Sequence, residues 1–183
     1  PGDILSKGMI VGMNRLGEAF SANRAFVPEM LMAARCMSAA TELLKPLMVG
    51  EGTEPVGRVC LGTVKGDMHD IGKNLVRIMM EGSGIEVFDL GVDTSAEQFV
   101  STAVENHCGV IACSSLLTTT MEEMREVVKL VHERGLQDQI KVIIGGAPIS
   151  QSFCDEIGAD YYAEDAGAAA REAVKILKVQ KAS

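Results

Sequence analysis

The chain of 183 residues contains no tryptophan, and aromatic residues make up only 4% of it. It also lacks an apolar run of about 20 residues, which excludes a membrane-spanning helix, and its start, Pro1-Gly2-Asp3, has neither the basic nor the apolar part of a secretion signal. Basic residues are outnumbered, because 17 Lys and Arg stand against 25 Asp and Glu, and the net charge is −8. An acidic chain repels phosphate groups. We therefore expect a cytoplasmic protein that has neither nucleic acid nor a membrane as a partner.

Paired cysteines are also absent from the sequence. None of the five cysteines forms a Cys-x-x-Cys motif; they are Cys36, Cys60, Cys108, Cys113 and Cys154. We expect buried, reduced thiols, as in intracellular proteins. The chain does not begin with Met, and we expect further sequence before Pro1.

The apolar residues, which make up 47% of the chain, follow two different patterns. The first part predicts two helices separated by a break at 21–23, with Pro28 in the first turn of the second helix. Pro46 and the Gly-rich stretch after it predict the end of that helix and a linker. We therefore place a helical domain at 1–52 and an α/β domain at 53–183. Two helices bury little apolar surface, so we expect them to belong to a larger bundle.

From Val56 onward, short apolar runs alternate with amphipathic stretches. The runs predict strands at 56–61, 85–89, 110–113, 141–144 and 159–162. The amphipathic stretches predict helices at 71–82, 95–107, 121–134, 150–157 and 166–178. This alternation favours an α/β fold with a Rossmann-like, flavodoxin-type sheet of five parallel strands and helices on both faces. Ligands bind such sheets at the carboxyl ends of the strands, so the loops that follow the strands are the candidate sites.

The loop after the first strand carries Asp67 and His69, two residues apart, ahead of Gly72. A carboxylate that accepts the Nδ1 proton of a histidine leaves its Nε2 free to bind a metal. The alternative is a solvated loop in which Asp67 or Asp70 caps the next helix, and the loop alone does not decide between the two. One histidine does not close a metal site, since zinc takes three or four protein ligands. It suits a metal that arrives already chelated by a porphyrin or a corrin.

Two other kinds of site lack their motifs. Gly72-Lys73 is followed by Asn74 instead of Ser or Thr, and no Gly-x-Gly-x-x-Gly follows the first strand, so the sequence predicts no phosphate-binding loop. His107 and His132 have no partner at metal-ligand spacing. We expect both on the surface near helix ends.

The loops after the third and fourth strands are also unusual. Five hydroxyl residues lie between Ser114 and Thr120. Thr120 and Glu123 have the spacing of a capping box, which accounts for one hydroxyl and leaves the others for a polar ligand group. Gly145-Gly146 either makes a tight turn or admits a ligand against bare backbone.

Together these segments resemble the cobalamin-binding domain of methionine synthase and the corrinoid proteins of methanol, methylamine and related methyltransferase systems. The resemblance is carried by three motifs that occur in order at the ends of predicted strands: Asp67-x-His69-x-x-Gly72, Ser114-x-Leu116 and Gly145-Gly146. The run from His69 to Asn74 also resembles the family, and the similarity covers nearly the whole chain. It implies that the cofactor is cobalamin or a related corrinoid, with its cobalt.

The resemblance also implies a role for each loop. His69 would be the lower axial ligand of the cobalt, in place of the cofactor's own dimethylbenzimidazole. Asp67 would bond His69, and the Thr120 hydroxyl would extend this relay where methionine synthase has Ser. Ser114 and Thr118 would hydrogen-bond the displaced base.

The helical part resembles the cap of the same family. Phe20 and Val27 fall where bulky apolar residues cover the upper face of the corrin, although Val27 is smaller than the Leu of methionine synthase. The first helices of a four-helix cap would precede Pro1. Gly145 and Gly146 would line the channel of the displaced tail. The implied cofactor-binding residues are Phe20, Val27, Asp67, Met68, His69, Asp70, Ile71, Gly72, Ser114, Leu116, Thr118, Thr120, Gly145 and Gly146.

The function that the resemblance implies is methyl transport. A substrate-specific methyltransferase would load a methyl group onto the bound cobalt, and a second methyltransferase would pass it to tetrahydrofolate or a thiol, with a reductive activator as a further partner. The chain would then be the corrinoid-carrying subunit of a methyltransferase system, not a complete enzyme. The alternatives are a corrinoid-dependent sensor and a plain nucleotide-binding or flavodoxin-like module. The methyl donor does not follow from the sequence, because the partner enzyme selects it.

Overall fold

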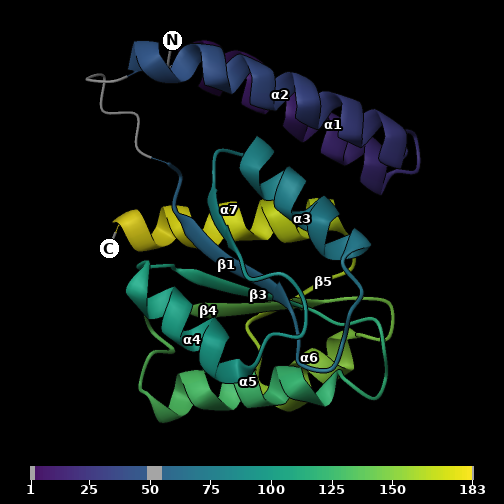
Figure 1. Ribbon diagram of the computed structural model, residues 1–183, viewed down its shortest axis with the longest axis vertical. Helices are drawn as coiled ribbons and strands as arrows, with labels where there is room; N and C mark the ends of the chain where they lie inside the picture. The colour runs from purple at the N-terminus through teal and green to yellow at the C-terminus, as the bar shows by residue number, and fades with distance from the viewer. Residues whose placement is uncertain (1–2, 49–54, 183) are drawn as a thin grey trace.

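The computed structural model describes residues 3–48 and 55–182, and within them a helical hairpin lies on one side of an α/β unit (Figure 1). The hairpin consists of η1 (Ile4–Met9), α1 (Ile10–Ser21) and α2 (Val27–Met48). The turn between α1 and α2 lies at the predicted break, and Pro28 lies in the first turn of α2, as predicted.

The predicted end of the second helix at Pro46 is wrong. α2 runs on to Met48, so Pro46 lies within its last turn. A proline has no backbone N–H and therefore removes one hydrogen bond of the helix, a loss that a helix of 22 residues tolerates near its end. The predicted domain boundary between 52 and 53 lies outside the described residues.

The sheet has five strands in the order β2-β1-β3-β4-β5, and every pair of neighbours is parallel. The strands are β1 (Arg58–Thr63), β2 (Glu86–Asp89), β3 (Val110–Ser114), β4 (Lys141–Gly145) and β5 (Tyr161–Ala163). β1, β3 and β4 are buried on both faces, because their apolar side chains point alternately into two separate cores. The predicted fold class is confirmed, although β1 begins two residues later than the predicted 56–61.

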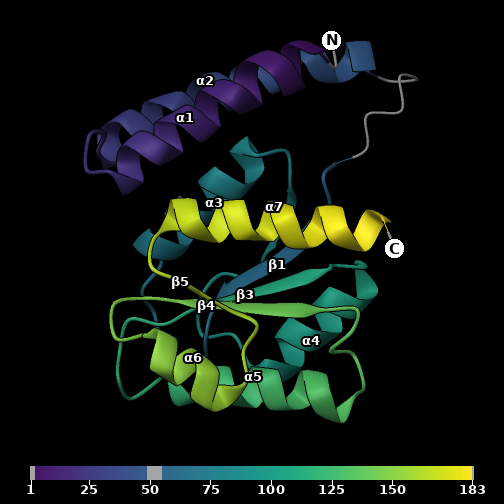
Figure 2. The same cartoon turned by 180° about the vertical axis from the view of Figure 1, so that it is seen from behind.

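Helices cover both faces of the sheet (Figures 1 and 2). They are α3 (Ile71–Gly82), α4 (Ala96–Glu105), α5 (Glu122–Glu133), α6 (Gln151–Ile157) and α7 (Ala166–Ala182). One core joins the sheet to α4, α5 and α6, and the other joins it to α3 and α7. α7 extends beyond the predicted 166–178, and in this added turn Gln180 donates to the carbonyls of Gly109 and Gln139.

The hairpin packs against α3 and α7 through small residues. A side chain at Gly17 would collide with Met79, and one at Gly82 would collide with Met13. Glycine therefore lets α1 and α3 approach closely. Near the hairpin turn, Ser21 Oγ donates to Asp165 Oδ1 at the start of α7 (3.1 Å).

Four of the five cysteines are buried as expected, and Cys36 on α2 is exposed, which corrects the prediction for that thiol. Burial raises the pKa of Cys60 and of Cys108 to about 12. No helix in the described part of the chain combines the length and apolarity needed to span a membrane.

Candidate functional site

The site lies at the carboxyl ends of β1 and β3, which are neighbours in the sheet. The loop after β1 carries Asp67 and His69, and the loop after β3 carries the run of hydroxyls. The two loops are joined at their bases, where Val64 N–H donates to the Ser114 carbonyl (3.0 Å). Residues about 50 positions apart therefore meet because their strands pair.

Asp67 and His69 are in contact, as predicted. Asp67 Oδ1 lies 2.7 Å from His69 Nδ1 and also accepts the His69 backbone N–H at 3.0 Å. A carboxylate only accepts hydrogen bonds, so Nδ1 carries the proton in this contact. The neutral imidazole then has its lone pair on Nε2, and the His69 side chain is 51% exposed.

The other oxygen of Asp67 is held by the loop after β3. Oδ2 accepts the N–H of Leu116 (2.8 Å) and the Thr120 hydroxyl (3.0 Å), with the N–H of Leu117 at 3.3 Å. The side chain of Asp67 is fully buried. Burial alone would raise the pKa of Asp67, but the N–H groups of Leu116 and His69, together with side-chain donors, hold this pKa well below its usual range. The site thus contains a buried carboxylate that stays ionised.

The prediction of a capping box at Thr120 is wrong. α5 begins at Glu122, and its N-cap, Met121, makes no side-chain cap bond. The Thr120 hydroxyl donates to Asp67 instead, and a hydrogen bond to an ionised carboxylate is stronger than one between neutral groups. The alternative of a helix cap at Asp67 or Asp70 also fails: Asp67 bonds as described above, and Asp70 at the N-cap of α3 makes no side-chain cap bond.

Ser115 was missed by the analysis of the sequence. Its side chain is buried, and its Oγ lies 2.9 Å from the Thr120 hydroxyl and 3.4 Å from Asp67 Oδ2. The cluster of five hydroxyls signalled a polar site. It did not reveal which hydroxyls point inward, since that depends on how the chain leaves β3.

The predicted tail-binding residues are only partly brought together. Ser114 is half-buried and lies in register with Gly145 across β3 and β4, whereas Thr118 is exposed further along its loop. A side chain on Gly146, whose φ is 138°, would collide with the Ser115 carbonyl, and one on Gly145 would come within 2.9 Å of the Ala163 carbonyl. Backbone packing alone therefore requires glycine at both positions.

The surface around His69 is apolar and exposed. Met68 is 69% exposed and Ile71 is 79% exposed, and Leu116 and Leu117 are also exposed on the loop after β3. A side chain added at Gly72 would meet no atom within 4 Å. Large apolar groups left in solvent together mark a binding surface. The open space and apolar surroundings fit a flat, bulky ligand above the imidazole.

The donor set fits a pre-chelated metal. Among residues 3–48 and 55–182, no group of three or more His, Cys, Asp or Glu side chains is arranged to hold a metal ion. A single imidazole with a free Nε2 can still supply one axial ligand to a metal held by a macrocycle. His107 and His132 are exposed near the ends of α4 and α5, as predicted.

The hairpin turn lies on the same side of the molecule as the carboxyl ends of the strands in both views (Figures 1 and 2). Phe20 is half-buried and packs onto the core beneath α3 and α7, while Val27 is more exposed. Phe26, which was not among the predicted site residues, is 61% exposed. The three residues therefore differ in exposure. Phe20 packs partly against the core, whereas Phe26 and Val27 leave apolar surface exposed to solvent.

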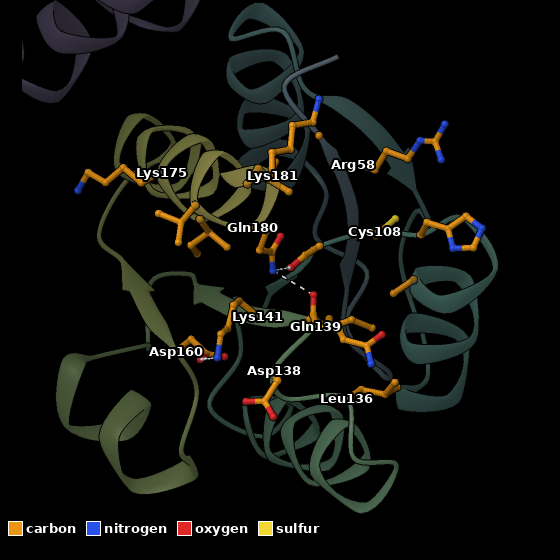
Figure 3. Close-up of a pocket in the computed structure, with 18 of the residues that line it drawn as sticks. Arg58, Cys108, Leu136, Asp138, Gln139, Lys141, Asp160, Lys175, Gln180 and Lys181 are labelled. Atoms are coloured by element: carbon orange, nitrogen blue, oxygen red, sulfur yellow. Dashed lines mark hydrogen bonds and ion pairs between the residues drawn. The ribbon is translucent and has the colours of Figure 1, made fainter. Parts of the chain in front are cut away.

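A separate cavity lies at the other end of the sheet. It has a volume of about 1170 Å³ and opens at the amino ends of the strands, between the ends of α4 and α7 (Figure 3). Several of its charged groups form ion pairs, such as Lys141 with Asp160 (3.2 Å), and Gln180 donates to backbone carbonyls of Gly109 and Gln139. This end of the sheet lies opposite His69, so the cavity is not the candidate site.

Two family models match the chain, and both are described as B12 binding domain. One covers residues 57–175, the α/β unit that contains Asp67 and His69, and the other covers residues 1–45, the helical hairpin. Each part of the fold thus has its own match.

Similar proteins cover nearly all of the chain. Dimethylamine corrinoid protein 1 of Methanosarcina acetivorans is 43% identical over 178 residues, which are 97% of this chain and 84% of the relative. The crystal structure of a cobalamin-binding protein from Desulfitobacterium hafniense is 35% identical, with a TM-score of 0.81, over 93% of this chain and 80% of that one. A chain of the methanol:cobalamin methyltransferase complex MtaBC from Methanosarcina barkeri is 27% identical, with a TM-score of 0.84, over 98% of this chain and 71% of that one.

Proposed function

This chain belongs to the B12-binding domain family and has a corrinoid as its cofactor, and we propose that it carries a methyl group on that corrinoid between two methyltransferases. The observation that carries the proposal is the Asp67–His69 contact, with Nε2 free among exposed apolar residues. When bound, the corrinoid supplies a cobalt centre that accepts and gives up the methyl group.

His69 is the lower axial ligand in this proposal, and the cofactor's own base is displaced. The contact with Asp67 orients the imidazole, and Thr120 and Ser115 hold Asp67 from behind. A hydrogen bond from a ligating histidine to a carboxylate raises the basicity of the ligand. The same contact holds the imidazole in place when no metal is bound.

The remaining loops hold the rest of the cofactor. The displaced base enters beside Ser114 and Thr118, and its tail follows the bare backbone at Gly145 and Gly146. Met68, Asp70, Ile71, Gly72 and Leu116 lie next to the lower face of the corrin in this arrangement. The supporting observations are the register of Ser114 with Gly145 and the open space beside Gly72.

The helical hairpin is the cap of the upper face, with Phe20 and Val27 over the corrin. A cap that excludes water must move aside for each transfer, as a lid does. The domain at 1–52 therefore moves relative to the domain at 53–183.

One partner is a substrate-specific methyltransferase, and the other passes the methyl group to tetrahydrofolate or a thiol. Methylated amines are the donor class that we favour, since several relatives at 40–43% identity are named dimethylamine corrinoid proteins. A reductive activator, which would supply electrons to restore the bound corrinoid after oxidation, is a further partner in this proposal.

The ligand role is tested with three proteins: wild type, His69→Ala and, as a matched control, His107→Ala, which removes an exposed histidine at the opposite end of the sheet. Each is mixed with hydroxocobalamin and desalted, and its visible spectrum is recorded. We expect His69→Ala to lower the affinity about tenfold or more and to change the spectrum, and His107→Ala to match wild type. Equal retention and identical spectra for all three would contradict the proposal.

The carrier role is tested with the loaded, chemically reduced protein, a dimethylamine methyltransferase and dimethylamine. We expect dimethylamine to be consumed together with a spectral change in the bound corrinoid. No consumption with methyltransferases for dimethylamine, monomethylamine or methanol would count against methyl transport.

A further inference from the structure

Lys73 is buried in the first turn of α3, and no role for it follows from the proposed function. Its side chain is only 2% exposed. A buried ammonium group is costly, and the first turn of a helix repels positive charge. Such a residue needs compensation by a close partner.

The partner is Asp89, the last residue of β2. Lys73 Nζ lies 2.6 Å from both oxygens of Asp89 and also donates to Asn74 Oδ1 (2.9 Å). Asp89 Oδ1 in turn accepts the N–H of Gly91 (2.9 Å). The ion pair therefore ties the start of α3 to the end of β2 and to the loop that follows it.

The loop after β2 also holds the segment that precedes His69. Asp93 Oδ1 accepts the N–H of Gly66 (2.7 Å), and Asp93 N–H donates to the carbonyl of Asp67 (3.0 Å). Further back, Thr63 N–H donates to the Gly91 carbonyl (2.9 Å). Residues 89–93 thus fix the segment both before and after His69.

A chain of hydrogen bonds continues from the ion pair towards the imidazole. Asn74, which accepts from Lys73, donates through Nδ2 to Asp70 Oδ2 (3.1 Å), and Asp70 directly follows His69. On the inner side, the buried Thr63 hydroxyl donates to the His69 carbonyl (2.8 Å). The backbone of His69 is therefore held from the ends of two strands, β1 and β2.

We infer that the Lys73–Asp89 ion pair is a positioning element for His69, which holds the imidazole where it can ligate the metal. The inference rests on the proposed ligand role of His69. Lys73 and Asp89 do not touch the cofactor in this role. They act by restricting the loop between β1 and α3.

The test uses Asp89→Asn and the matched control Glu86→Gln. Glu86 is at the other end of β2, where it forms an exposed ion pair with Arg58 (2.9 Å). Each substitution is made in the wild-type and the His69→Ala backgrounds, and the Kd for hydroxocobalamin is measured by absorbance titration. We expect Asp89→Asn to raise the Kd about tenfold when His69 is present and less than about twofold when it is absent. Glu86→Gln should change neither.

A merely structural effect would give a different result. If Asp89→Asn weakened binding equally in both backgrounds, or in neither, the inference would be overturned. Should Asp89→Asn fail to fold because Lys73 is left buried and unpaired, the double variant Lys73→Met/Asp89→Asn removes both charges and is tested in its place.

Hydrogen exchange in the apoprotein separates this inference from the proposed function. We expect the amides of residues 64–72 to exchange about tenfold faster in Asp89→Asn than in Glu86→Gln or wild type. Unchanged exchange would overturn the positioning role even if His69 proves to be the ligand. If His69→Ala leaves the corrinoid spectrum unchanged while Asp89→Asn exchanges faster, the ligand role fails and the restraint on this segment stands.

Discussion

The two ends of the sheet differ in what they bury and what they expose. At the carboxyl ends, Asp67 is a fully buried carboxylate surrounded by donors, and beside it the large apolar side chains Met68 and Ile71 are exposed. At the amino ends there is a cavity of about 1170 Å³, and several of its charged groups form partly exposed pairs such as Lys141–Asp160 (Figure 3).

The comparison shows that volume is a poor guide to this site. Exposed charges that already form ion pairs with each other need no ligand to neutralise them. A buried charge that is held by two loops is costly to build, and exposed apolar side chains beside it gain from being covered. The smaller feature therefore marks the functional end, and substitutions at the two ends should have unequal effects.

The largest difference is expected between Gly146→Ala and Gly109→Ala. At Gly146 the added methyl collides with the Ser115 backbone at a φ of 138°, so we expect a loss of about 3 kcal/mol or more in the free energy of unfolding. At Gly109 it meets the movable end of Gln180 and the side chain of Leu177, for a loss of about 1 kcal/mol. Urea unfolding measures both, and equal losses would contradict the rigid packing inferred for the loop after β4.

Asp67→Asn should come next. The amide of Asn cannot accept all the hydrogen bonds that Asp67 receives, so we expect a loss of about 2 kcal/mol in the free energy of unfolding. We also expect an affinity for hydroxocobalamin that is weaker by roughly 10–100-fold, as is typical when the hydrogen-bond partner of a metal ligand is removed. The control is Asp160→Asn at the amino ends, where we expect less than about 1 kcal/mol and no change in affinity. The same effect in both variants would remove the distinction between the two ends.

The stability that the ionised Asp67 contributes should also depend on pH. The pKa of Asp67 is depressed in the folded state, so its charge stabilises the fold fully above its unfolded pKa of about 4 and loses this effect as the pH falls towards the folded value. We expect the stability difference between wild type and Asp67→Asn to be constant from pH 7 to about 5 and to shrink below about 4. Urea midpoints across this range measure it, and a constant gap down to pH 2 would contradict the shift.

The smallest effect concerns the thiols. Cys108 lines the amino-end cavity but is 3% exposed, and burial raises its pKa to about 12. We expect iodoacetamide at pH 8 to modify the exposed Cys36 alone in the folded protein, and Cys36→Ser to remain unlabelled. Mass spectrometry of the labelled peptides decides this, and rapid labelling of Cys108 would mean that the cavity is open at its base.

The order of elements followed from the sequence, and so did the loops that form the candidate site. Short apolar runs with intervening amphipathic stretches predict β1 to β5 because strands buried on both faces need continuous apolar residues. The contact between Asp67 and His69 was also predictable, since it is local and spans two residues.

Long-range choices were not predictable in the same way. Thr120 has the spacing of a capping box, but its hydroxyl bonds a carboxylate 53 residues earlier in the chain. Ser115 and the Lys73–Asp89 pair depend on which strands are neighbours and how tightly the loops pack. Pro46 is a helix breaker by type, yet α2 contains it. In each case a tertiary contact or position in the element overrode the local preference.

The separation between Asp67 and its donors has a consequence for biosynthesis. The two N–H groups and the hydroxyl that donate to Asp67 Oδ2 come from residues 49–53 positions later in the chain. While the ribosome is still making β2 and α4, this oxygen must remain hydrated, because the donors that replace its water have not yet emerged. The carboxylate that orients the histidine can therefore be buried only after the chain beyond β3 has been released and folded. A ligand that depends on the contact between His69 and the buried Asp67 would therefore bind only to the folded chain.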